Sequence, residues 1–422
     1  MQKIRLKYGS EQIPFEYDEN FFNVLGNEKQ KTALTDAEIG ARLDNPIDSP
    51  TLEEIILPDE TVLIVVPDAT RSVAAGQIVN LLVRRLIAGG TNPSNITIIF
   101  ATGIHRAVTE AEKRAILTPF IAQRIKTLNH DARDLAALRR FGETQRGIPV
   151  ELNRAVAEYN RIIIVGGVNF HYFAGFSGGR KMICPGLGSS RTINETHKLA
   201  FDCERKTRRA GVGAGLLKGN AVHEEFIEIV EKINPSFVVN SIVNEQGAAT
   251  EIFAGNWKTA HEQACDFYAA KHTVKIAEKR DVVIVSGGGA PFDLNMIQAH
   301  KALDTAASAC TSGGTIIFLA KCADGLGRSD FLKWFEAEDS GKLVDVLCEK
   351  YQVNGQTAWS LLRKAEKFNV QILTTLGENE TRRMRLHKLS DFKTAVSKIA
   401  ARTSGYILPF GAKFLIKNAS EI

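Results

Sequence analysis

Short runs of β-branched and aliphatic residues recur along the chain, and most of them end in a polar or glycine-rich turn. Because the residues within a run are apolar without alternation, each run is typical of a strand buried on both faces of a parallel sheet. Stretches with apolar residues at helical spacing lie between the runs. We therefore predict strands at residues 62–66, 96–100, 162–165, 282–285, 315–319 and 370–373, and helices at 76–88, 222–233, 258–271 and 298–311.

The alternation of strands and helices predicts an α/β fold in which mostly parallel sheets carry flanking helices. A basic segment before the strand at residue 282 indicates a domain boundary. We expect residues 1–272 to form an N-terminal domain and residues 277–400 to form a C-terminal α/β domain. Residues 405–422 are expected to return and pack on the first domain. In such folds ligands bind beyond the carboxyl ends of the strands, so we expect an active site in the cleft between the domains.

The composition is that of a folded protein: of 422 residues, 44% are hydrophobic and 24% are charged. A net charge of +5 is mild for this length, so we predict no nucleic-acid partner. No apolar run approaches the ~20 residues that span a bilayer, and the N-terminus does not resemble a signal peptide, so we predict no membrane partner. The six cysteines contain no Cys-x-x-Cys pair, which predicts reduced thiols in a cytoplasmic protein.

Polar and cationic side chains follow four of the predicted strands. The carboxyl ends of parallel strands meet at one edge of a sheet, so we expect these side chains to converge on one site. The segments concerned are Asp68-Ala69-Thr70-Arg71, Gly103-Ile104-His105-Arg106, Asn169-Phe170-His171 and, after the glycines at 287–289, Gln298 with Lys301.

His105 and His171 are candidates for acid–base catalysis, because imidazole titrates near neutral pH. Arg71 is suited to hold a carboxylate through two hydrogen bonds. Structural alternatives remain open at this point. Asp68 could cap the following helix, Arg71 could form a surface salt bridge, and either histidine could be a buried structural residue.

Gln298 and Lys301 are three residues apart and share one helix face, which fits either a ligand contact or a solvated surface. The segment Ser177-Gly178-Gly179-Arg180-Lys181 is glycine-rich, and its backbone N–H groups could bind a phosphate. It is not a P-loop, because Met182 follows the lysine, and no dinucleotide fingerprint follows a predicted strand. Patterns typical of metal sites are also missing, and His197 stands alone on a predicted helix.

Taken in order, these motifs resemble the lactate racemase family, whose enzymes use a nickel-pincer nucleotide. Each motif alone is weak, but the ordered set covers most of the chain. The set comprises Asp68-x-Thr70-Arg71, Gly103-x-His105-Arg106, His171, Lys181 ten residues later, His197 sixteen residues after that, and Gln298-x-x-Lys301.

The resemblance implies a cofactor, nickel pyridinium-3,5-bisthiocarboxylic acid mononucleotide, bound to Lys181 through a thioamide. His197 would supply the fourth nickel ligand, which suits a planar Ni(II) site. The segment Ser177-Gly178-Gly179 would hold the phosphate, and Asp68 and Thr70 would orient the cofactor. Other proteins that build this cofactor are implied as partners.

The resemblance also implies the reaction, racemisation or epimerisation of a 2-hydroxy acid. The 2-carbon would transfer hydride to the cofactor and receive it back on its other face, while His105 and His171 serve as the acid–base pair. The N-terminal domain would then bind the cofactor, and the C-terminal domain would close over the substrate. Substrate contacts are expected from Arg71, Gln298, Lys301 and Trp359.

Ile297 stands where lactate-specific members of the family carry an aromatic residue. Lactate, malate and other short 2-hydroxy acids therefore all remain candidate substrates. Two alternative functions also stay open. A nicotinamide-dependent 2-hydroxy acid dehydrogenase would need a dinucleotide fingerprint and would give His197 no task. A non-catalytic binder of a phosphorylated small molecule would leave one of the two histidines unused.

Overall fold

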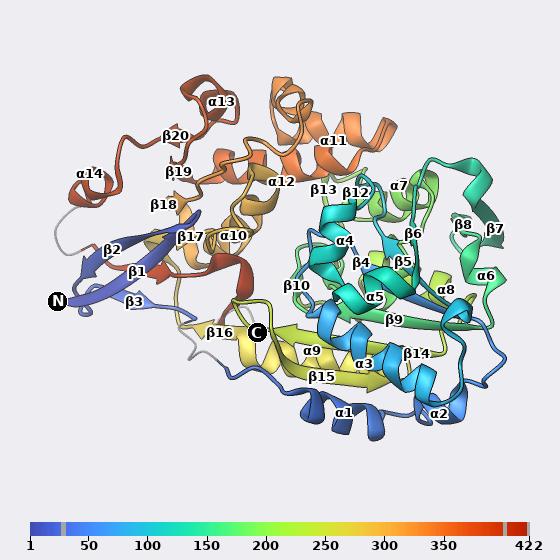
Figure 1. Cartoon of the computed structure of the whole chain (residues 1–422). Helices are drawn as coiled ribbons and strands as arrows, with labels where there is room; N and C mark the ends of the chain where they lie inside the picture. Colours follow the sequence, from blue (N-terminus) through green and yellow to red (C-terminus); the bar gives the residue numbers. More distant parts are fainter. Residues whose placement is uncertain (27–30, 400–402, 420–422) are drawn as a thin grey trace. The chain divides into compact units, whose positions relative to one another are not determined.

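The computed structural model describes residues 1–26, 31–399 and 403–419, which form two compact units (Figure 1). We name each unit after a central strand of its sheet. The β4 unit holds the described residues of Lys29–Ala200 and Ala210–Ala270, and the β17 unit holds those of Met1–Glu28, Phe201–Arg209 and Lys271–Ile422. The α/β class with mostly parallel sheets is confirmed.

The β4 unit is built on a six-stranded sheet with the order β15-β14-β9-β4-β5-β6. All neighbours are parallel except β14 and β15, which are antiparallel. The strands predicted at 62–66, 96–100 and 162–165 are confirmed as β4, β5 and β9. The strands are β4 (Val62–Pro67), β5 (Ile96–Ala101), β6 (Lys126–Asn129), β9 (Arg161–Gly167), β14 (Phe237–Val243) and β15 (Ala249–Gly255).

Both faces of this sheet are buried, which explains the unbroken apolar runs in the sequence. In β4, Val62, Ile64 and Val66 belong to one hydrophobic core, whereas Leu63 and Val65 belong to the other. Helices cover the two faces: α1 (Asp36–Asp44), α2 (Leu52–Ile55), α3 (Ala75–Ala88) and α5 (Pro119–Arg124) on one, and α6 (Ala155–Glu158) and α8 (Ala221–Glu231) on the other.

The β17 unit contains a second six-stranded sheet, with the order β20-β19-β18-β17-β21-β3 and every neighbour parallel. One face packs on α10, α11 and α12, and the other packs on the β1–β2 hairpin and α14. Its elements are β1 (Gln2–Tyr8), β2 (Glu11–Tyr17), β3 (Phe22–Val24), β17 (Arg280–Ser286), α10 (Met296–Ala309), β18 (Cys310–Leu319), α11 (Ser340–Glu349), α12 (Val353–Lys367), β19 (Asn369–Leu373), β20 (His387–Lys388), α14 (Phe392–Ser397) and β21 (Gly405–Leu408).

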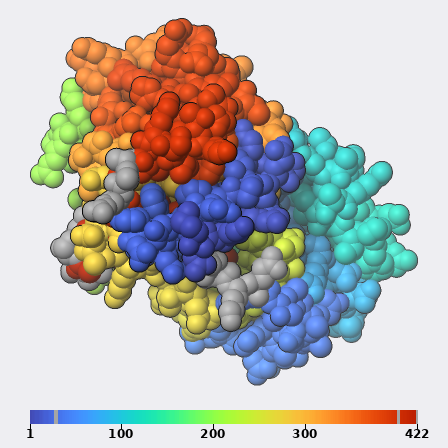
Figure 2. All heavy atoms as spheres, turned by 90° about the vertical axis from the view of Figure 1, so that its left-hand side faces the viewer, coloured from blue at the N-terminus to red at the C-terminus, as the bar shows by residue number. Residues whose placement is uncertain are grey.

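The boundaries of the units differ from the expected domains of 1–272 with 405–422, and 277–400. β21, at the start of the return segment, lies between β17 and β3 and pairs with both. The N-terminal residues and the return segment therefore complete the second sheet, because the edge of β17 needs a partner. Figure 2 shows the N-terminal residues beside C-terminal ones of the same unit. Residues 27–30, 400 and 420–422 of the expected ranges lie outside the described residues.

A short excursion of the chain also belongs to the β17 unit. The hairpin of β12 (Phe201–Asp202) and β13 (Thr207–Arg208) is joined to α11 by a disulfide between Cys203 and Cys348. The prediction that all six cysteines are reduced thiols is therefore wrong for this pair. The two residues are 145 positions apart, so only the tertiary fold brings them together.

The remaining elements complete the two units. Among the described residues, no helix combines the length and apolar character needed to cross a bilayer. These elements are η1 (Pro93–Asn95), α4 (Glu110–Ile116), η2 (Leu135–Ala137), β7 (Leu138–Glu143), β8 (Pro149–Asn153), β10 (Phe170–His171), β11 (Gly175–Phe176), η3 (Gly179–Met182), α7 (Ser190–Lys198), α9 (Thr259–His272), β16 (Thr273–Ile276), η4 (Phe331–Glu336), α13 (Glu378–Arg383), η5 (Gly411–Lys413) and β22 (Leu415–Asn418).

Candidate active site

The turn after β4 is organised by the buried carboxylate of Asp68. Its Oδ1 accepts hydrogen bonds from the backbone N of Thr70 at 3.0 Å and from the Thr70 hydroxyl at 2.6 Å. The N-cap of α3 is Ala74, so the alternative that Asp68 caps this helix is wrong. Asp68 instead closes its own turn, as aspartate often does after a strand.

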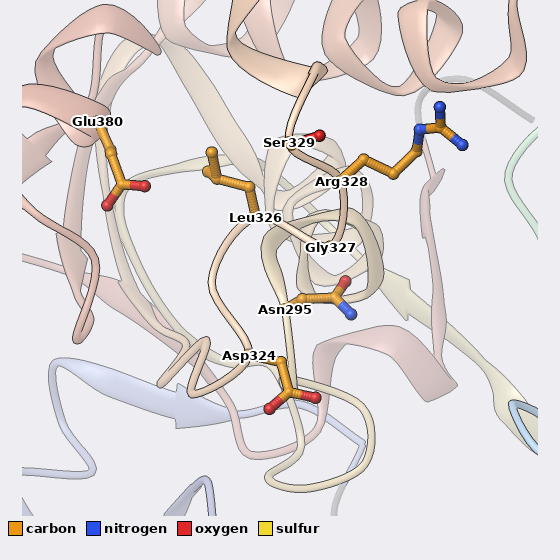
Figure 3. A pocket seen from close by; sticks show the side chains of 7 residues that line it. All are labelled: Asn295, Asp324, Leu326, Gly327, Arg328, Ser329 and Glu380. Atoms are coloured by element: carbon orange, nitrogen blue, oxygen red, sulfur yellow. The ribbon is translucent and has the colours of Figure 1, made fainter.

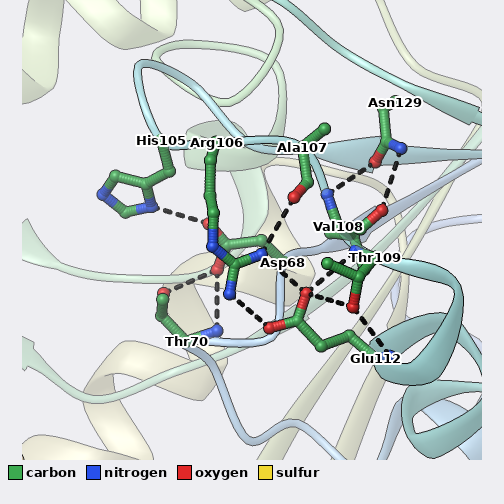
Figure 4. Close-up of polar contacts among 9 residues, drawn as sticks. All are labelled: Asp68, Thr70, His105, Arg106, Ala107, Val108, Thr109, Glu112 and Asn129. Carbon is green, nitrogen blue, oxygen red and sulfur yellow. Dashed lines mark hydrogen bonds and ion pairs between the residues drawn. The ribbon is translucent and has the colours of Figure 1, made fainter.

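The other oxygen of this carboxylate contacts His105. Oδ2 of Asp68 lies 2.6 Å from Nδ1 of His105 (Figure 4). Burial raises the pKa of Asp68, but the hydrogen bonds from His105 and Thr70 outweigh it, so the pKa lies below its ordinary value. Asp68 is therefore ionised at neutral pH. We assign the proton of neutral His105 to Nδ1, which leaves the lone pair of Nε2 to accept a proton.

The two arginines in these segments differ in their surroundings. Arg106, next to His105, turns towards Glu112 and forms two hydrogen bonds with it, at 2.7 and 2.6 Å (Figure 4). Arg71 is exposed, and within the described part of the chain its guanidinium has no hydrogen-bond or ion-pair partner. The alternative that Arg71 forms a surface salt bridge is thus not what the structure shows.

A second group of predicted residues lies around the ring of Phe173, which the sequence analysis did not identify as a site residue. The ring of Phe173 lies edge-on to His171 at 4.5 Å and to His197 at 5.0 Å, measured between ring centroids. The Nζ atom of Lys181 lies 5.5 Å from the centroid of the same ring. The only sequence signal for Phe173 is its place two residues after His171, in an aromatic run.

His197 lies in the last turn of α7, whose N-cap is Ser189. Its side chain is 5% exposed, and Nδ1 is 3.3 Å from the hydroxyl of Thr196. Burial and then the charge of Lys181 lower the pKa of His197 to about 3. The imidazole is therefore neutral at physiological pH, and the neutral form is the one that binds metals.

Lys181 lies on η3 and is 8% exposed. Besides Phe173, the ring of Phe226 lies 5.9 Å from its Nζ atom. The neighbouring thiol of Cys184 is buried, and burial raises its pKa. The amine is thus held in a largely apolar, aromatic environment.

Backbone hydrogen bonds connect the loop of His105 to the segment of Lys181. Gly103 donates to the carbonyl of Gly186 at 2.9 Å, and Gly186 donates to the carbonyl of Lys181 at 2.9 Å. These bonds link the loop of His105 to the segment of Lys181 within the β4 unit, whereas the convergence of all the predicted segments stays a prediction.

The glycine-rich segment is packed against the protein. Gly178 and Gly179 have positive φ angles, and a Cβ at Gly179 would lie 2.7 Å from the ring of His261. Gly179 donates its N–H to Asn240 at 2.9 Å, and the hydroxyl of Ser177 donates to the carbonyl of Gly167 at 2.7 Å. Phosphate contact through these two donors would therefore have to replace hydrogen bonds within the protein, and it stays a prediction.

Three predicted substrate-binding residues, Gln298, Lys301 and Trp359, lie in the β17 unit. Lys301 donates to the side chain of Gln298 at 2.7 Å, so both do share one face of α10. Trp359 is only 2% exposed and lies edge-on to Phe201, with 4.8 Å between the ring centroids. Trp359 is thus a core residue of this unit, and its role as a pocket wall stays a prediction.

A cavity of about 540 Å³ in the β17 unit contains none of the predicted residues. Asn295, in its lining, caps α10 by accepting a hydrogen bond from the backbone N of Gln298 at 3.0 Å. Figure 3 shows the lining residues, Asn295, Asp324, Leu326, Gly327, Arg328, Ser329 and Glu380.

Comparison with known proteins identifies the family to which the chain belongs. Residues 8–208 match the lactate racemase N-terminal domain, and residues 275–406 match the lactate racemase C-terminal domain. The chain is 31% identical to lactate racemase of Thermoanaerobacterium thermosaccharolyticum over 83% of its length and 82% of that protein. It is 32% identical to lactate racemase of Lactiplantibacillus plantarum over 68% of its length and 66% of that protein.

Solved structures show the same fold. The lactate racemase apoprotein from Thermoanaerobacterium thermosaccharolyticum superposes with a TM-score of 0.89 at 26% identity, covering 99% of this chain and 100% of that one. A protein from Thermotoga maritima gives a TM-score of 0.68 at 20% identity, covering 93% of this chain and 100% of that one, a likeness of fold alone. The chain belongs to the lactate racemase family of isomerases.

Proposed function

We propose that this protein racemises or epimerises a short 2-hydroxy acid with a nickel-pincer nucleotide bound to Lys181. The observation that carries the proposal is the grouping around Phe173, whose ring contacts His171, His197 and the amine of Lys181. One amine for attachment, one neutral imidazole and one imidazole for proton transfer thereby occupy a single region of the β4 unit.

The residues present fit such a cofactor. Lys181 is buried beside the rings of Phe173 and Phe226, and aromatic rings attract a cation such as the pyridinium ring. His197 is neutral and available as a metal ligand. Within the described ranges, no three His, Cys, Asp or Glu side chains are grouped to hold a metal. A metal on His197 would therefore take its other ligands from the bound group, as the pincer supplies them.

When bound, the cofactor supplies a reversible acceptor for the hydride of the substrate's 2-carbon. The chain's own residues then handle the proton and the orientation. His105 accepts the hydroxyl proton at Nε2, and the negative charge of Asp68 stabilises the resulting imidazolium. Racemisation needs a second proton-transfer group, because two enantiomers present the hydroxyl on different sides, and His171 takes that role.

The exposed guanidinium of Arg71 is proposed to hold the substrate carboxylate, since a guanidinium pairs with a carboxylate through two parallel hydrogen bonds. Gln298 and Lys301 of the β17 unit are proposed to add polar contacts to the substrate. The aliphatic Ile297 leaves the choice among lactate, malate and related acids to a direct assay of chiral 2-hydroxy acids.

The decisive experiment is to produce the protein together with the proteins that build the cofactor, and to measure intact mass and metal content. We expect an adduct that maps to Lys181 and about one nickel ion per chain. Lys181→Ala should abolish the adduct, whereas Lys258→Ala, at a partly exposed lysine of the same unit, should keep it. An unmodified Lys181 in active protein would contradict the proposal.

A further inference from the structure

Arg180 directly precedes Lys181, and the proposed function gives it no task. Its side chain is 0% exposed, and burial lowers its pKa to about 10. It therefore remains charged at neutral pH, and among the described residues no carboxylate pairs with it. Burying a charge in this way is costly unless hydrogen bonds compensate it. The groups to which Arg180 donates hydrogen bonds therefore indicate the role of its side chain.

The guanidinium holds the turn between β10 and β11. Nη2 donates to the carbonyl of Ala174 at 2.7 Å and to that of Phe176 at 3.1 Å. Nη1 lies 2.9 Å from Nε2 of His261, a buried residue of α9 that also contacts the carbonyl of Ser177 at 2.9 Å. Arg180 thus holds the carbonyls of Ala174 and Phe176, and His261 contacts that of Ser177.

This turn carries the residues around which the proposed site is arranged. His171 pairs with Gly175 in the hairpin, and Nδ1 of His171 accepts a hydrogen bond from the backbone N of Ala174 at 3.3 Å. Phe173 lies at the tip, and the Asn220 side chain donates to its carbonyl at 2.9 Å. The Phe173 ring is therefore fixed by a backbone that Arg180 holds from one side and Asn220 from another.

We propose that Arg180 is a positioning residue, which fixes the Phe173 ring through the carbonyls of Ala174 and Phe176 and thereby sets the place of the Lys181 amine. The planar fork of the guanidinium reaches two carbonyls at once, which a lysine ammonium does not reproduce in the same geometry. The inference deepens the proposed function, because a displaced amine would misplace whatever it carries.

The first test uses the protein without cofactor. In Arg180→Lys the charge is kept and the fork is lost. The rate of reductive methylation of Lys181 is measured by peptide mass spectrometry, relative to that of Lys258 in the same sample. We expect this ratio to change at least about threefold, while Arg161→Lys, at the amino end of β9, leaves it unchanged. A lower melting temperature with an unchanged ratio would show a merely structural role and overturn the proposal.

A second variant covers the case that Arg180→Lys does not fold. Phe173→Leu keeps Arg180 and its hydrogen bonds but removes the ring between the site residues. We expect it to change the methylation ratio of Lys181 as well. Where both single variants fold, the double variant should show no further change, because both act through one contact. An unchanged ratio in Phe173→Leu overturns the proposal.

The loaded enzyme gives an independent readout. Small displacements of a reacting group can cost up to about 10²-fold in rate. We therefore expect the kcat of Arg180→Lys to fall by ~10- to 100-fold. KM should stay within about twofold, because Arg180 does not touch the substrate. An absence of adduct on wild-type Lys181 would reject the proposed function, whereas the methylation comparison would still decide the role of Arg180.

Discussion

Oδ2 of Asp68 lies 2.6 Å from Nδ1 of His105, although the two residues follow different strands of the sheet. The carboxylate is buried and its side chain is 8% exposed, whereas that of His105 is 46% exposed. A buried anion thus orients an imidazole that remains accessible. This arrangement fixes the ring and leaves Nε2 available to a substrate, as a general base requires.

Replacing Asp68 by Asn should impair the reaction without unfolding the protein. The amide keeps the size of the side chain but removes the charge that stabilises protonated His105. We expect kcat to fall by about tenfold or more, up to the ~10²–10⁴-fold that general acid–base catalysis contributes. Racemisation is followed by chiral chromatography. Arg106→Gln, next to His105 but turned towards Glu112, serves as the control and should keep wild-type activity.

Single replacement of His105 or His171 by Ala should abolish racemisation while leaving the cofactor attached. Both imidazoles are proposed to transfer protons, whereas attachment depends on Lys181. Chiral assay and intact mass are measured on the same preparation, so that loss of activity is separated from loss of cofactor. Near-normal activity in either variant would refute the scheme with two proton-transfer groups.

The disulfide between Cys203 and Cys348 should be visible in a thiol count. Denatured protein without reductant should expose four thiols, those of Cys184, Cys265, Cys310 and Cys322, and reductant should raise the count to all six. A count of six thiols before reduction would show that the bond does not form.

The same disulfide should also stabilise the β17 unit. It closes a loop of 145 residues, and a bond of this kind typically contributes about 2–4 kcal/mol to the free energy of unfolding. Cys203→Ser should lower the urea midpoint of non-reduced protein accordingly. Adding reductant should lower the wild-type midpoint to that of the variant, whose own midpoint should then not respond.

Acid should destabilise the protein through His223, among other buried histidines. Burial and then the charges of Arg180 and Lys258 lower its pKa to about 3, against ~6.5 in an unfolded chain. The unfolded chain therefore binds a proton that the folded protein does not. The stability that this neutral ring contributes is complete above about pH 6.5 and is lost as the pH falls towards about 3.

Replacing His223 by Gln removes this difference in proton binding. As the pH falls, the free energy of unfolding should then decrease less steeply in the variant than in the wild type. The two slopes should differ by ~1 kcal/mol per pH unit between about pH 6 and pH 4. Urea unfolding at several pH values measures it. His387→Gln, at an exposed histidine, is the matched control and should leave the slope unchanged. Parallel slopes for wild type and His223→Gln would contradict the expectation.

The sequence by itself determined six buried strands, four of the longer helices and the order of the polar segments. The unbroken run Val62–Val66 is apolar because both faces of β4 are buried, and a local pattern of this kind can be recognised without knowing the partners. The polar segments were recognisable because they directly follow such runs. The convergence of the His105 and Lys181 segments could be expected because parallel strands end at a common edge.

Only the tertiary structure decided the long-range relationships. The N-terminal strand Phe22–Val24 and the return strand Gly405–Leu408 join the second sheet, since strand pairing at a sheet edge depends on which strands the fold brings close. The bond between Cys203 and Cys348 depends on the same kind of distant approach. The ring of Phe173 and the buried guanidinium of Arg180 were invisible in the sequence for a related reason. Their importance comes from which side chains and carbonyls surround them, and packing in three dimensions, rather than any local periodicity, sets those neighbours.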